Sequence, residues 1–400
     1  MGPGGRRRLP DPGAVHDERE IEAVVEVLRS TTLGLGPNVA EVERRVADLL
    51  ARRHGVMVNS GSSALRLAID LLQLEPGDEV ITPALTFGTD VAPLVHSGVV
   101  PAFVDVDTTT YQLDADGIAA MVSDRSRAIL APNLVGNVPD WDRIREVADA
   151  HGLLVIEDSC DVLDARLRGR RTGERANLSV TSFARGHAIT AAGGGGLLGV
   201  DDHDQLDRAV ALRRWGRRGE THEFGSRRGE RERLGPLADG TPYDLVFVFD
   251  HAGHNFEPLE IAAAYARVQL DKLAGFNTRR QQAWDRLDAF FVDHEDRVVR
   301  PRTTEGAATT WMRYPFILRD GLDRTEIQRA LEKRGVPTLM VWTGNILRQP
   351  GFAGIQRREP EGGLPGADRV MDRALSLPTH HALQDEDINH ILDCLSDVFA

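Results

Sequence analysis

Lysine is almost absent from this chain of 400 residues. Lys272 and Lys333 are the only lysines among its 48 basic residues, and all the others are arginine. A biased genomic base composition can exchange lysine for arginine over a protein surface. It cannot do so where a reaction needs an amine nucleophile, because an arginine guanidinium effectively never loses its proton. The scarcity therefore matters for any reaction that depends on a lysine amine.

Cysteine and long apolar runs are scarce as well. Cys160 and Cys394 are the only cysteines, which is too few for a disulfide scaffold or for a four-thiolate zinc or iron–sulfur site within one chain. No run approaches the roughly 18 apolar residues of a membrane helix. The opening segment is not followed by the apolar core of a signal peptide. We expect a cytoplasmic protein with no iron–sulfur cluster on this chain.

The chain also lacks net positive charge. Its formal net charge of -13 repels phosphate backbones and anionic membranes, although a local pocket can still hold one small anion. We therefore expect neither nucleic acid nor a membrane as a partner. A hydrophobic share of 41% and a charged share of 27% are ordinary for a globular protein. The length favours a large domain with a smaller one behind it.

Short β-rich runs alternate with helical segments from about residue 37 to residue 215. Strands separated by helices indicate right-handed crossovers and a mainly parallel sheet that is covered on both faces. In such α/β sheets, ligands bind beyond the carboxyl ends of the strands. The predicted strands are Val56–Val58, Glu79–Ile81, Ala102–Val104, Ala128–Leu130, Leu153–Ile156, Leu178–Thr181 and Leu197–Gly199.

The same patterns predict the domain organisation. Residues 1–13, rich in Gly, Pro and Arg, are expected to form a flexible arm or a docking arm. Residues 14–256 are expected to form the large domain, in which residues 217–242 are charged and without periodicity. That composition favours a solvated insertion over a functional arginine patch. Residues 257–400 are expected to form a helical linker and a smaller α/β domain. Its predicted elements are a helix over residues 257–293, a strand at Tyr314–Leu318, and helices at Glu326–Arg334 and Asp385–Phe399.

Two segments carry candidate ligand groups. In NSGSSALRLAI, Gly61 and Ser62 lie between a strand and a helix that is expected to begin near Ala64. Free backbone N–H groups and the helix dipole can bind an anion there, although Ser and Gly before a helix are more often only caps. In VIEDSCD, an apolar strand ends near Asp158. A carboxylate at that place can keep a pyridinium nitrogen protonated, although strand-end acids without such a function are commoner.

A third segment, VTSFARGHAITAAGGGG, contains Ser182, then His187 five residues later, and then the glycine run Gly193–Gly196. Together with TFG at residues 86–88 and GHN at residues 253–255, these motifs resemble those of the DegT/StrS-type sugar aminotransferases. The resemblance extends from about residue 33 to residue 399. It implies a PLP-dependent transferase fold of type I, with residues 14–256 as the cofactor-binding domain.

The resemblance also implies roles for single residues. A pyridoxal or pyridoxamine phosphate would be stacked by Phe87, and its ring nitrogen would be paired by Asp158. Asn255 would reach the phosphate of the neighbouring subunit, which implies a homodimer. The phosphate contacts within the chain would come from Gly61, Ser62 and Ser182.

In the family, the position five residues after the serine holds the lysine that forms a Schiff base with the cofactor, whereas this chain has His187. That exchange is typical of the NDP-4-keto-6-deoxyhexose 3-dehydrases of the colitose and ascarylose type, whose segment SFYPAHHIT is similar to SFARGHAIT here. Three further segments resemble theirs: CDVLDA is similar to CDALG, LVGN to TLGN, and WTGNILRQP to FAGNLTRQP. The resemblance implies removal of the C3 hydroxyl of a 4-keto sugar, in deoxysugar or natural-product biosynthesis. His187 would be the base, a role that suits a group titrating near neutral pH.

The same subgroup suggests substrate contacts and also shows departures. Candidate substrate-binding residues are Asn137, His251, Asn345 and Arg348. The subgroup's second histidine is Ala188 here, and its glutamate before the glycine pair is Gly193. Ascarylose-type enzymes carry a cysteine-rich insertion for a [2Fe–2S] cluster, whereas residues 217–242 contain no cysteine. Turnover would then need an amino donor such as glutamate, an external reductase or a redox-neutral route.

Two other functions remain as alternatives. One is a sugar aminotransferase that uses a displaced lysine, either Lys272 or Lys333, although both lie in charged helical contexts that favour a solvated amine. The other is a non-catalytic homologue that binds a nucleotide sugar or a partner protein. The sequence names neither the sugar nor the nucleotide.

Overall fold

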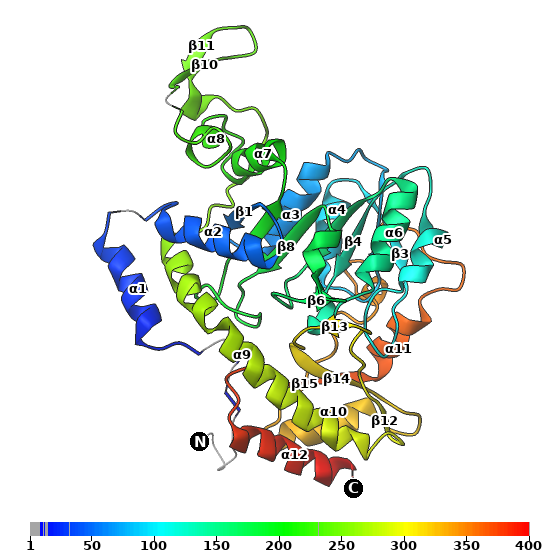
Figure 1. Cartoon of the computed structure of the whole chain (residues 1–400). Helices are drawn as coiled ribbons and strands as arrows, with labels where there is room; N and C mark the ends of the chain where they lie inside the picture. The colour runs from blue at the N-terminus through cyan, green and yellow to red at the C-terminus, as the bar shows by residue number, and fades with distance from the viewer. Residues whose placement is uncertain (1–8, 11, 13–14, 32, 231, 400) are drawn as a thin grey trace.

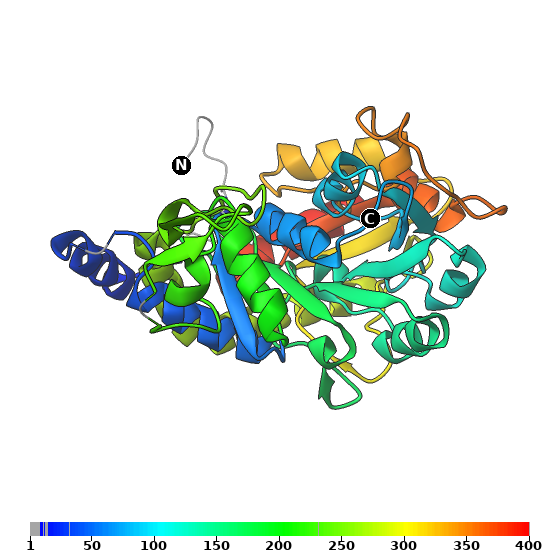
Figure 2. The same ribbon diagram turned by 90° about the horizontal axis from the view of Figure 1, so that it is seen from above.

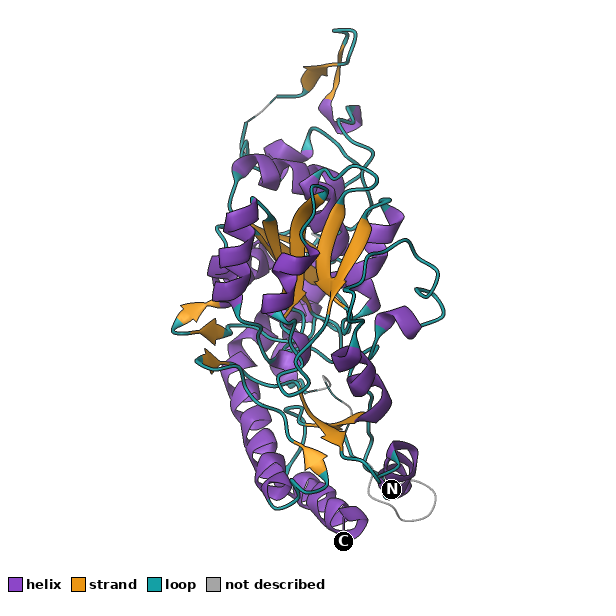
Figure 3. Cartoon of the chain, turned by 90° about the vertical axis from the view of Figure 1, so that its right-hand side faces the viewer, coloured by secondary structure: helices purple, strands orange, loops and turns teal. Residues whose placement is uncertain are grey.

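The computed structural model describes residues 9–399 apart from residues 11, 13, 14, 32 and 231. A seven-stranded sheet lies at the centre, with helices on both faces (Figures 1 and 3). Its strands are β1 (His54–Val58), β2 (Glu79–Pro83), β3 (Val100–Val104), β4 (Ser126–Pro132), β5 (Leu154–Asp158), β8 (Leu178–Ser182) and β9 (Gly196–Val200). Their order is β1-β9-β8-β5-β4-β2-β3, parallel from β8 to β3 and antiparallel in the pairs β1–β9 and β8–β9.

The mainly parallel sheet confirms the predicted fold class, and each of the seven predicted strands is present. The reason they can be read from the sequence is that both faces of the sheet are buried. In β4, Ala128 and Leu130 pack into the core on one face, whereas Ile129 and Ala131 pack into the core on the other. A strand buried on both faces appears in the sequence as a continuous apolar run.

Helices complete both layers around the sheet. One face is covered mainly by α3 (Gly61–Leu72), α4 (Gly88–His96) and α7 (His203–Arg213). The other face is covered by α2 (Pro37–Leu49), α5 (Ile118–Met121), α6 (Trp141–His151) and the first part of the long helix α9 (Glu260–Val292). The crossovers bring the carboxyl ends of the parallel strands to one edge of the sheet.

A second, three-stranded sheet has the order β12-β14-β15 and is antiparallel. Its strands are β12 (Val298–Val299), β14 (Arg313–Leu318) and β15 (Ala374–Pro378). The end of α9 packs on this sheet together with α10 (Arg324–Lys333) and α12 (Asp385–Phe399), while α11 (Pro365–Arg373) lies at its border with the large sheet. All four elements predicted after residue 256 are therefore present, with boundaries shifted by no more than a few residues. No described helix is long and apolar enough to span a membrane.

The segment of residues 217–242 is more ordered than its composition predicts. It contains the short helix α8 (Glu220–Glu223) and the strand β10 (Leu234–Pro236), and its last residue begins β11 (Pro242–Asp244), which pairs with β10 in a hairpin. The hairpin projects away from the two sheets (Figures 1 and 3). Arg218 pairs with Asp250, and Arg227 pairs with Glu230. Arg231 lies outside the described residues.

The first described helix packs against the rest of the chain. Helix α1 (Glu18–Arg29) lies along α9. Seen from above, α1 in dark blue lies at one end of the molecule, and the orange segment after Pro350 lies near the other (Figure 2). Most of residues 1–13 lie outside the described part of the chain, but Leu9 is buried in the core of the smaller sheet. A third small sheet links β13 (Ala307–Ala308) to β6 (Arg166–Leu167) and β7 (Arg170–Arg171).

The contact between α1 and α9 gives the first testable prediction. The ammonium of Lys272 lies 2.6 Å from the carboxylate of Glu20, whose side chain is fully buried. Removing the ammonium in Lys272→Met leaves a buried charge without its cation, which should cost about 3 kcal/mol of unfolding free energy. Urea unfolding measures this loss. The control Lys333→Met changes an exposed lysine and should cost less than about 0.5 kcal/mol. Equal stability of the two variants would contradict the prediction.

Candidate active site

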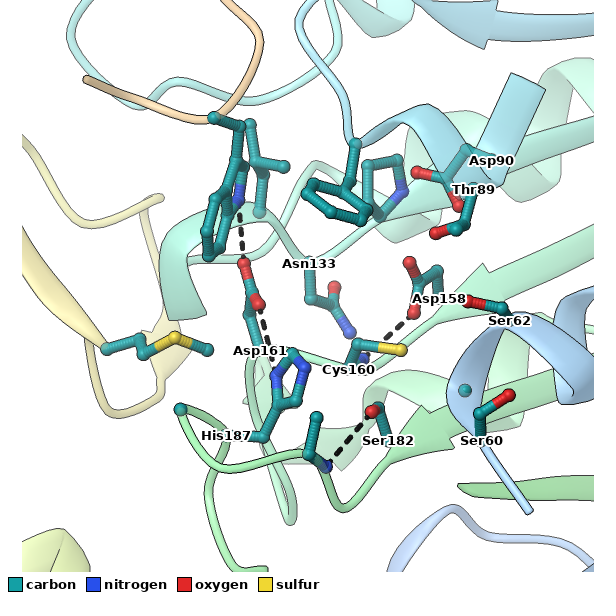
Figure 4. A pocket seen from close by; sticks show the side chains of 18 of the residues that line it. Ser60, Ser62, Thr89, Asp90, Asn133, Asp158, Cys160, Asp161, Ser182 and His187 are labelled. Carbon is teal, nitrogen blue, oxygen red and sulfur yellow. Dashed lines mark hydrogen bonds and ion pairs between the residues drawn. The ribbon is translucent and has the colours of Figure 1, made fainter. Parts of the chain in front are cut away.

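A cavity of about 420 Å³ lies at the carboxyl ends of β5 and β8, between the two main sheets (Figure 4). Its volume is within the range of small-molecule and cofactor sites. It is lined from the large sheet by the starts of α3 and α4 and from the smaller sheet by the start of β14. The sequence-predicted residues among its lining are Gly61, Ser62, Phe87, Asp158, Ser182 and His187.

One end of the cavity has the features of an anion site. Helix α3 begins at Gly61, three residues earlier than predicted, because the hydroxyl of Ser60 caps it by accepting from the N–H of Ser63 at 3.1 Å. The first N–H groups of a helix have no acceptor within the helix, so Gly61 and Ser62 present donors to the cavity. A Cβ at Gly61 would lie 2.6 Å from the Cβ of Ser182. Only glycine therefore allows the helix start and the end of β8 to meet here.

Two buried carboxyl groups lie beside each other further inside. Asp158, the last residue of β5, accepts a hydrogen bond from the N–H of Cys160 at 2.9 Å, and burial raises its pKa. Asp90 accepts from the hydroxyl of Thr86. Burial, followed by the charge of Asp158, raises the pKa of Asp90 well above its usual value. Asp90 is therefore the carboxyl that keeps its proton more readily, and Asp158 is the one available to pair with a cation.

An aromatic side chain also lines the cavity. Phe87 precedes the first turn of α4 and is 53% exposed, which is unusual for a phenylalanine. Its ring makes an edge-on contact with Trp342, with 6.0 Å between the ring centroids. One face of Phe87 thus remains free to stack on a planar ligand.

His187 lies on the loop that follows β8, and its imidazole is 20% exposed. Its Nδ1 lies 3.6 Å from Oδ1 of Asp161, while the other ring nitrogen points toward the interior of the cavity (Figure 4). Arg280 of α9 holds the loop by donating to the carbonyls of His187 at 3.0 Å and Ala188 at 2.8 Å. The position of the imidazole is therefore set by tertiary contacts and not by the loop alone.

Five of the predicted site residues lie outside the cavity lining. Asn137 is fully buried and donates to the carbonyls of Thr110 at 3.0 Å and Arg302 at 3.2 Å. His251 lies in the loop after the hairpin, where its N–H bonds to the carbonyl of Gly216. Burial lowers the pKa of His251.

The other three are held by contacts of their own. Asn345 donates to Asp368 at 3.0 Å, and Arg348 pairs with Asp368 and with Asp372. Asn255 is exposed, and its backbone pairs with that of Arg214. Its carbonyl also accepts from Asn59, which directly precedes the Ser60 cap. The substrate or phosphate roles of these five residues therefore stay predictions.

Sequence reasoning missed several residues that line the cavity. Cys160 and Asp161 stand in the segment CDVLDA and follow a buried strand directly, which was the signal for them. Trp342 stands in WTGNILRQP. Arg313 begins β14 and had no sequence signal, and burial lowers its pKa to about 10.

Neither lysine of the chain lies at the cavity. Lys272 is paired with Glu20 and Asp17 on the far side of α9, and Lys333 lies near the end of α10. Within the described residues, no group of three or more His, Cys, Asp or Glu side chains is placed to hold a metal ion. In the loop that follows β8, His187 is the only side chain with a nitrogen that can act as a base near neutral pH.

The paired carboxyls predict a pH-dependent stability in cofactor-free protein. A carboxyl whose pKa is raised on folding contributes stability that is complete below its ordinary value of 3.8 and is lost as pH rises through the folded-state value. The neutral isostere in Asp90→Asn avoids that loss. Its melting temperature relative to wild type should therefore increase as pH is raised above about 4, until the pH passes the raised pKa of Asp90. A difference that is constant with pH would contradict the prediction.

Comparisons with known proteins agree with this geometry. The dTDP-4-dehydro-2,6-dideoxy-D-glucose 3-dehydratase of Saccharopolyspora spinosa is 34% identical over 411 residues, which cover 99% of this chain and 87% of that protein. The GDP-4-keto-6-deoxy-D-mannose 3-dehydratase of Yersinia pseudotuberculosis is 27% identical, with 97% of this chain and 98% of that protein covered. The structure of the Escherichia coli GDP-4-keto-6-deoxy-D-mannose-3-dehydratase with bound hydrated PLP superposes with a TM-score of 0.87 at 25% identity, over 97% of this chain and all of that one. The profile of the DegT/DnrJ/EryC1/StrS aminotransferase family matches residues 15–396, and the chain belongs to this family.

Proposed function

We propose that this protein removes the C3 hydroxyl of a 4-keto sugar, linked to a nucleotide, with pyridoxamine or pyridoxal phosphate as cofactor. One observation carries the proposal: an imidazole, that of His187, faces the cavity on the loop that follows β8, and no lysine lines that cavity in the described residues. Relatives of similar length are named as 3-dehydratases of 4-keto sugars linked to dTDP or GDP. The chemistry of the site and the names of the relatives thus agree.

The lining residues suit the proposed cofactor. The N–H groups at the start of α3 and the hydroxyl of Ser182 are matched to a phosphate, because helix starts favour anions. Asp158 is matched to a protonated ring nitrogen, whose positive charge would offset the cost of burying its carboxylate. Phe87 offers a free aromatic face to the ring. These residues come from four separate segments, so together they would hold the ring in place.

The residues of the chain then have distinct tasks. When bound, the cofactor supplies an amine for the C4 ketone and an electron-accepting ring that drives out the neighbouring C3 hydroxyl. His187 would act as the base: its Nε2 would take the proton lost by the carbon that bears the cofactor amine and pass it to the departing C3 oxygen, which would leave as water. Imidazole can exchange protons near neutral pH but does not capture a carbonyl as a lysine amine does. A histidine in place of the family's lysine at position 187 therefore favours elimination over amino transfer.

The two alternatives have less support. A sugar aminotransferase would need a lysine amine at the cavity, and Lys272 is instead held by the buried Glu20. A non-catalytic homologue would have no need for a buried, paired carboxyl such as Asp158 or for an imidazole facing the cavity. Buried polar groups of this kind cost stability and are retained where they serve a site.

Substrate contacts are expected at the end of the cavity that faces the smaller sheet. Met312, Arg313, Leu339 and His380 line that end. Arg313 donates to the hydroxyl and carbonyl of Ser376 and has no carboxylate partner among the described residues. We infer that these residues contact the sugar, with the predicted Asn137, His251, Asn345 and Arg348 acting outside this cavity or after a rearrangement.

Renewal of the cofactor calls for a second substrate or partner. A structure related to this chain, that of a GDP-4-keto-6-deoxymannose-3-dehydratase, contains a trapped PLP–glutamate adduct. We infer that glutamate or a similar amino donor restores the amine here. An external reductase is the alternative, and the chain's two cysteines are too few to hold an iron–sulfur cluster of their own.

We also infer a homodimer in which Asn255 completes the partner's phosphate site. Asn255 is exposed and lies outside the cavity of its own chain. The preceding segment exposes several large apolar side chains, as expected of a surface that another subunit covers. They are Leu234, Tyr243, Val246, Phe247 and Phe249. We infer a division into a cofactor-binding domain (residues 14–256) and a helical linker with a smaller domain (residues 257–400), because the strands of the two main sheets lie on either side of residue 256.

The role of His187 predicts a selective loss of activity. In His187→Ala the dehydration rate should fall by a factor of about 10²–10⁴, because the base is lost. Cofactor affinity should change little, since the phosphate and ring contacts remain. Dehydration is followed by mass spectrometry and binding by absorbance titration. His96→Ala, an exposed histidine at the end of α4, is the matched control. Activity within about tenfold of wild type would exclude His187 as the base.

The shared site predicts complementation between two inactive variants. His187→Ala and Asn255→Ala should each be impaired as homodimers. In a mixed dimer, one site has both changes and the other has neither, so the purified mixed dimer should have about half of wild-type activity. Co-expression with two affinity tags isolates the mixed dimer. No recovery in that dimer would show that Asn255 serves its own chain.

A further inference from the structure

We propose that Asp161 is a positioning residue that fixes the ring tautomer of His187, so that the bare nitrogen Nε2 meets the substrate. The proposal deepens the proposed dehydratase function and rests on it for its catalytic consequence. Its structural part concerns only side chains of this chain and can be tested without cofactor.

The first evidence is the contact itself. Oδ1 of Asp161 lies 3.6 Å from Nδ1 of His187, and Asp161 is nearly buried, with 8% of its side chain exposed. Nδ1 is buried and has no other hydrogen-bond partner among the described residues. The distance is slightly longer than a hydrogen bond, as is common for catalytic contacts before a ligand binds. An ionised carboxylate only accepts hydrogen bonds, so it selects the tautomer with the proton on Nδ1.

The second evidence is that the other carboxylate oxygen is already occupied. Oδ2 of Asp161 accepts from the backbone N–H of Val135 at 2.7 Å and from the indole N–H of Trp342 at 2.9 Å. Both groups are donors only. They hold the carboxyl plane in one orientation and leave Oδ1 directed at His187 (Figure 4).

The third line of evidence is the backbone conformation of the two donor residues, Val135 and Trp342. Val135 has φ of 59° and Trp342 has φ of 42°, in the left-handed region that bulky and β-branched residues avoid. Such strain persists where surrounding structure enforces it, often at functional sites. The neighbouring Gly136 is required for the turn, because a Cβ there would lie 2.4 Å from the carbonyl of Thr310.

These contacts also give a structural role to three sequence segments that supply none of the proposed cofactor contacts. Val135 belongs to LVGN, Asp161 to CDVLDA and Trp342 to WTGNILRQP. The three segments are distant in the chain and meet at one carboxylate. Each supplies a part of the arrangement that orients the imidazole.

The arrangement predicts an unusual result for Asp161→Asn. The amide oxygen must take the place of Oδ2, because two donors point at it. The amide NH₂ then faces Nδ1 of His187, which can only accept from it. The proton of the neutral ring moves to Nε2, and the nitrogen that faces the cavity is no longer a base. Asp161→Ala instead removes the preference for a proton on Nδ1 of His187 without creating a preference for a proton on Nε2.

The test is nitrogen NMR of cofactor-free protein labelled with ¹⁵N in the histidine rings, with the His187 signals identified by their loss in His187→Ala. Wild type should show the neutral ring protonated at Nδ1, and Asp161→Asn should show it protonated at Nε2. The same tautomer in both proteins would overturn the proposal. This readout does not depend on the reaction, so it remains decisive if the dehydratase function itself is wrong.

Kinetics supply the second readout. Asp161→Asn should lower kcat by about 10² or more at nearly unchanged KM, and Asp161→Ala should lose less. A merely structural role would give the reverse order, since Asn preserves the shape of the side chain, and that order would overturn the proposal. The control Asp149→Asn alters an exposed carboxylate of α6 and should leave both readouts unchanged.

Discussion

The short turn after β5 places two buried carboxylates three residues apart, and the chemistry of the cavity depends on that turn. Asp158, at the end of the strand, lines the cavity and is the residue proposed to pair with a ring nitrogen, and Asp161 faces the imidazole of His187. Burying two acids side by side is costly unless each is matched by donors or cations. Here the first accepts from the backbone of Cys160, and the second accepts from Val135 and Trp342. The surrounding segments are folded so that they bring these hydrogen-bond donors to the two carboxylates.

This constraint links the two sheets. Trp342 belongs to the segment between α10 and β15, so its indole ties the smaller sheet to the turn after β5. Arg280, on the long helix α9 that joins both sheets, holds the carbonyls of the loop that carries His187. The imidazole is therefore fixed from both sides of the cavity. A lysine side chain at this position would be longer and more flexible, whereas a ring held at one nitrogen presents the other in a single direction.

The elements that could be predicted are those whose buried residues form a regular apolar pattern in the sequence. The central strands were found because their apolar runs reflect burial on both faces, and α12 because its apolar spacing matches a helix. The hairpin of β10 and β11 was not found, since strands of only three residues, Leu-Gly-Pro and Pro-Tyr-Asp, are too short to carry a periodic signal. The start of α3 was placed too late because glycine is a poor helix former, and the cap by Ser60 compensates. Asp161 escaped notice because its partner Trp342 is 181 residues away.

The central claim is that an imidazole in this cavity directs the cofactor toward elimination instead of amino transfer. The most direct measurement is a single turnover of the protein, loaded with pyridoxamine phosphate, on a nucleotide-linked 4-keto-6-deoxy sugar without any amino donor, followed by mass spectrometry of the sugar. The account predicts a sugar product that has lost one oxygen atom and contains no nitrogen, because the amine leaves as ammonia and the cofactor ends as pyridoxal phosphate. A 4-amino sugar with its C3 oxygen retained would contradict it.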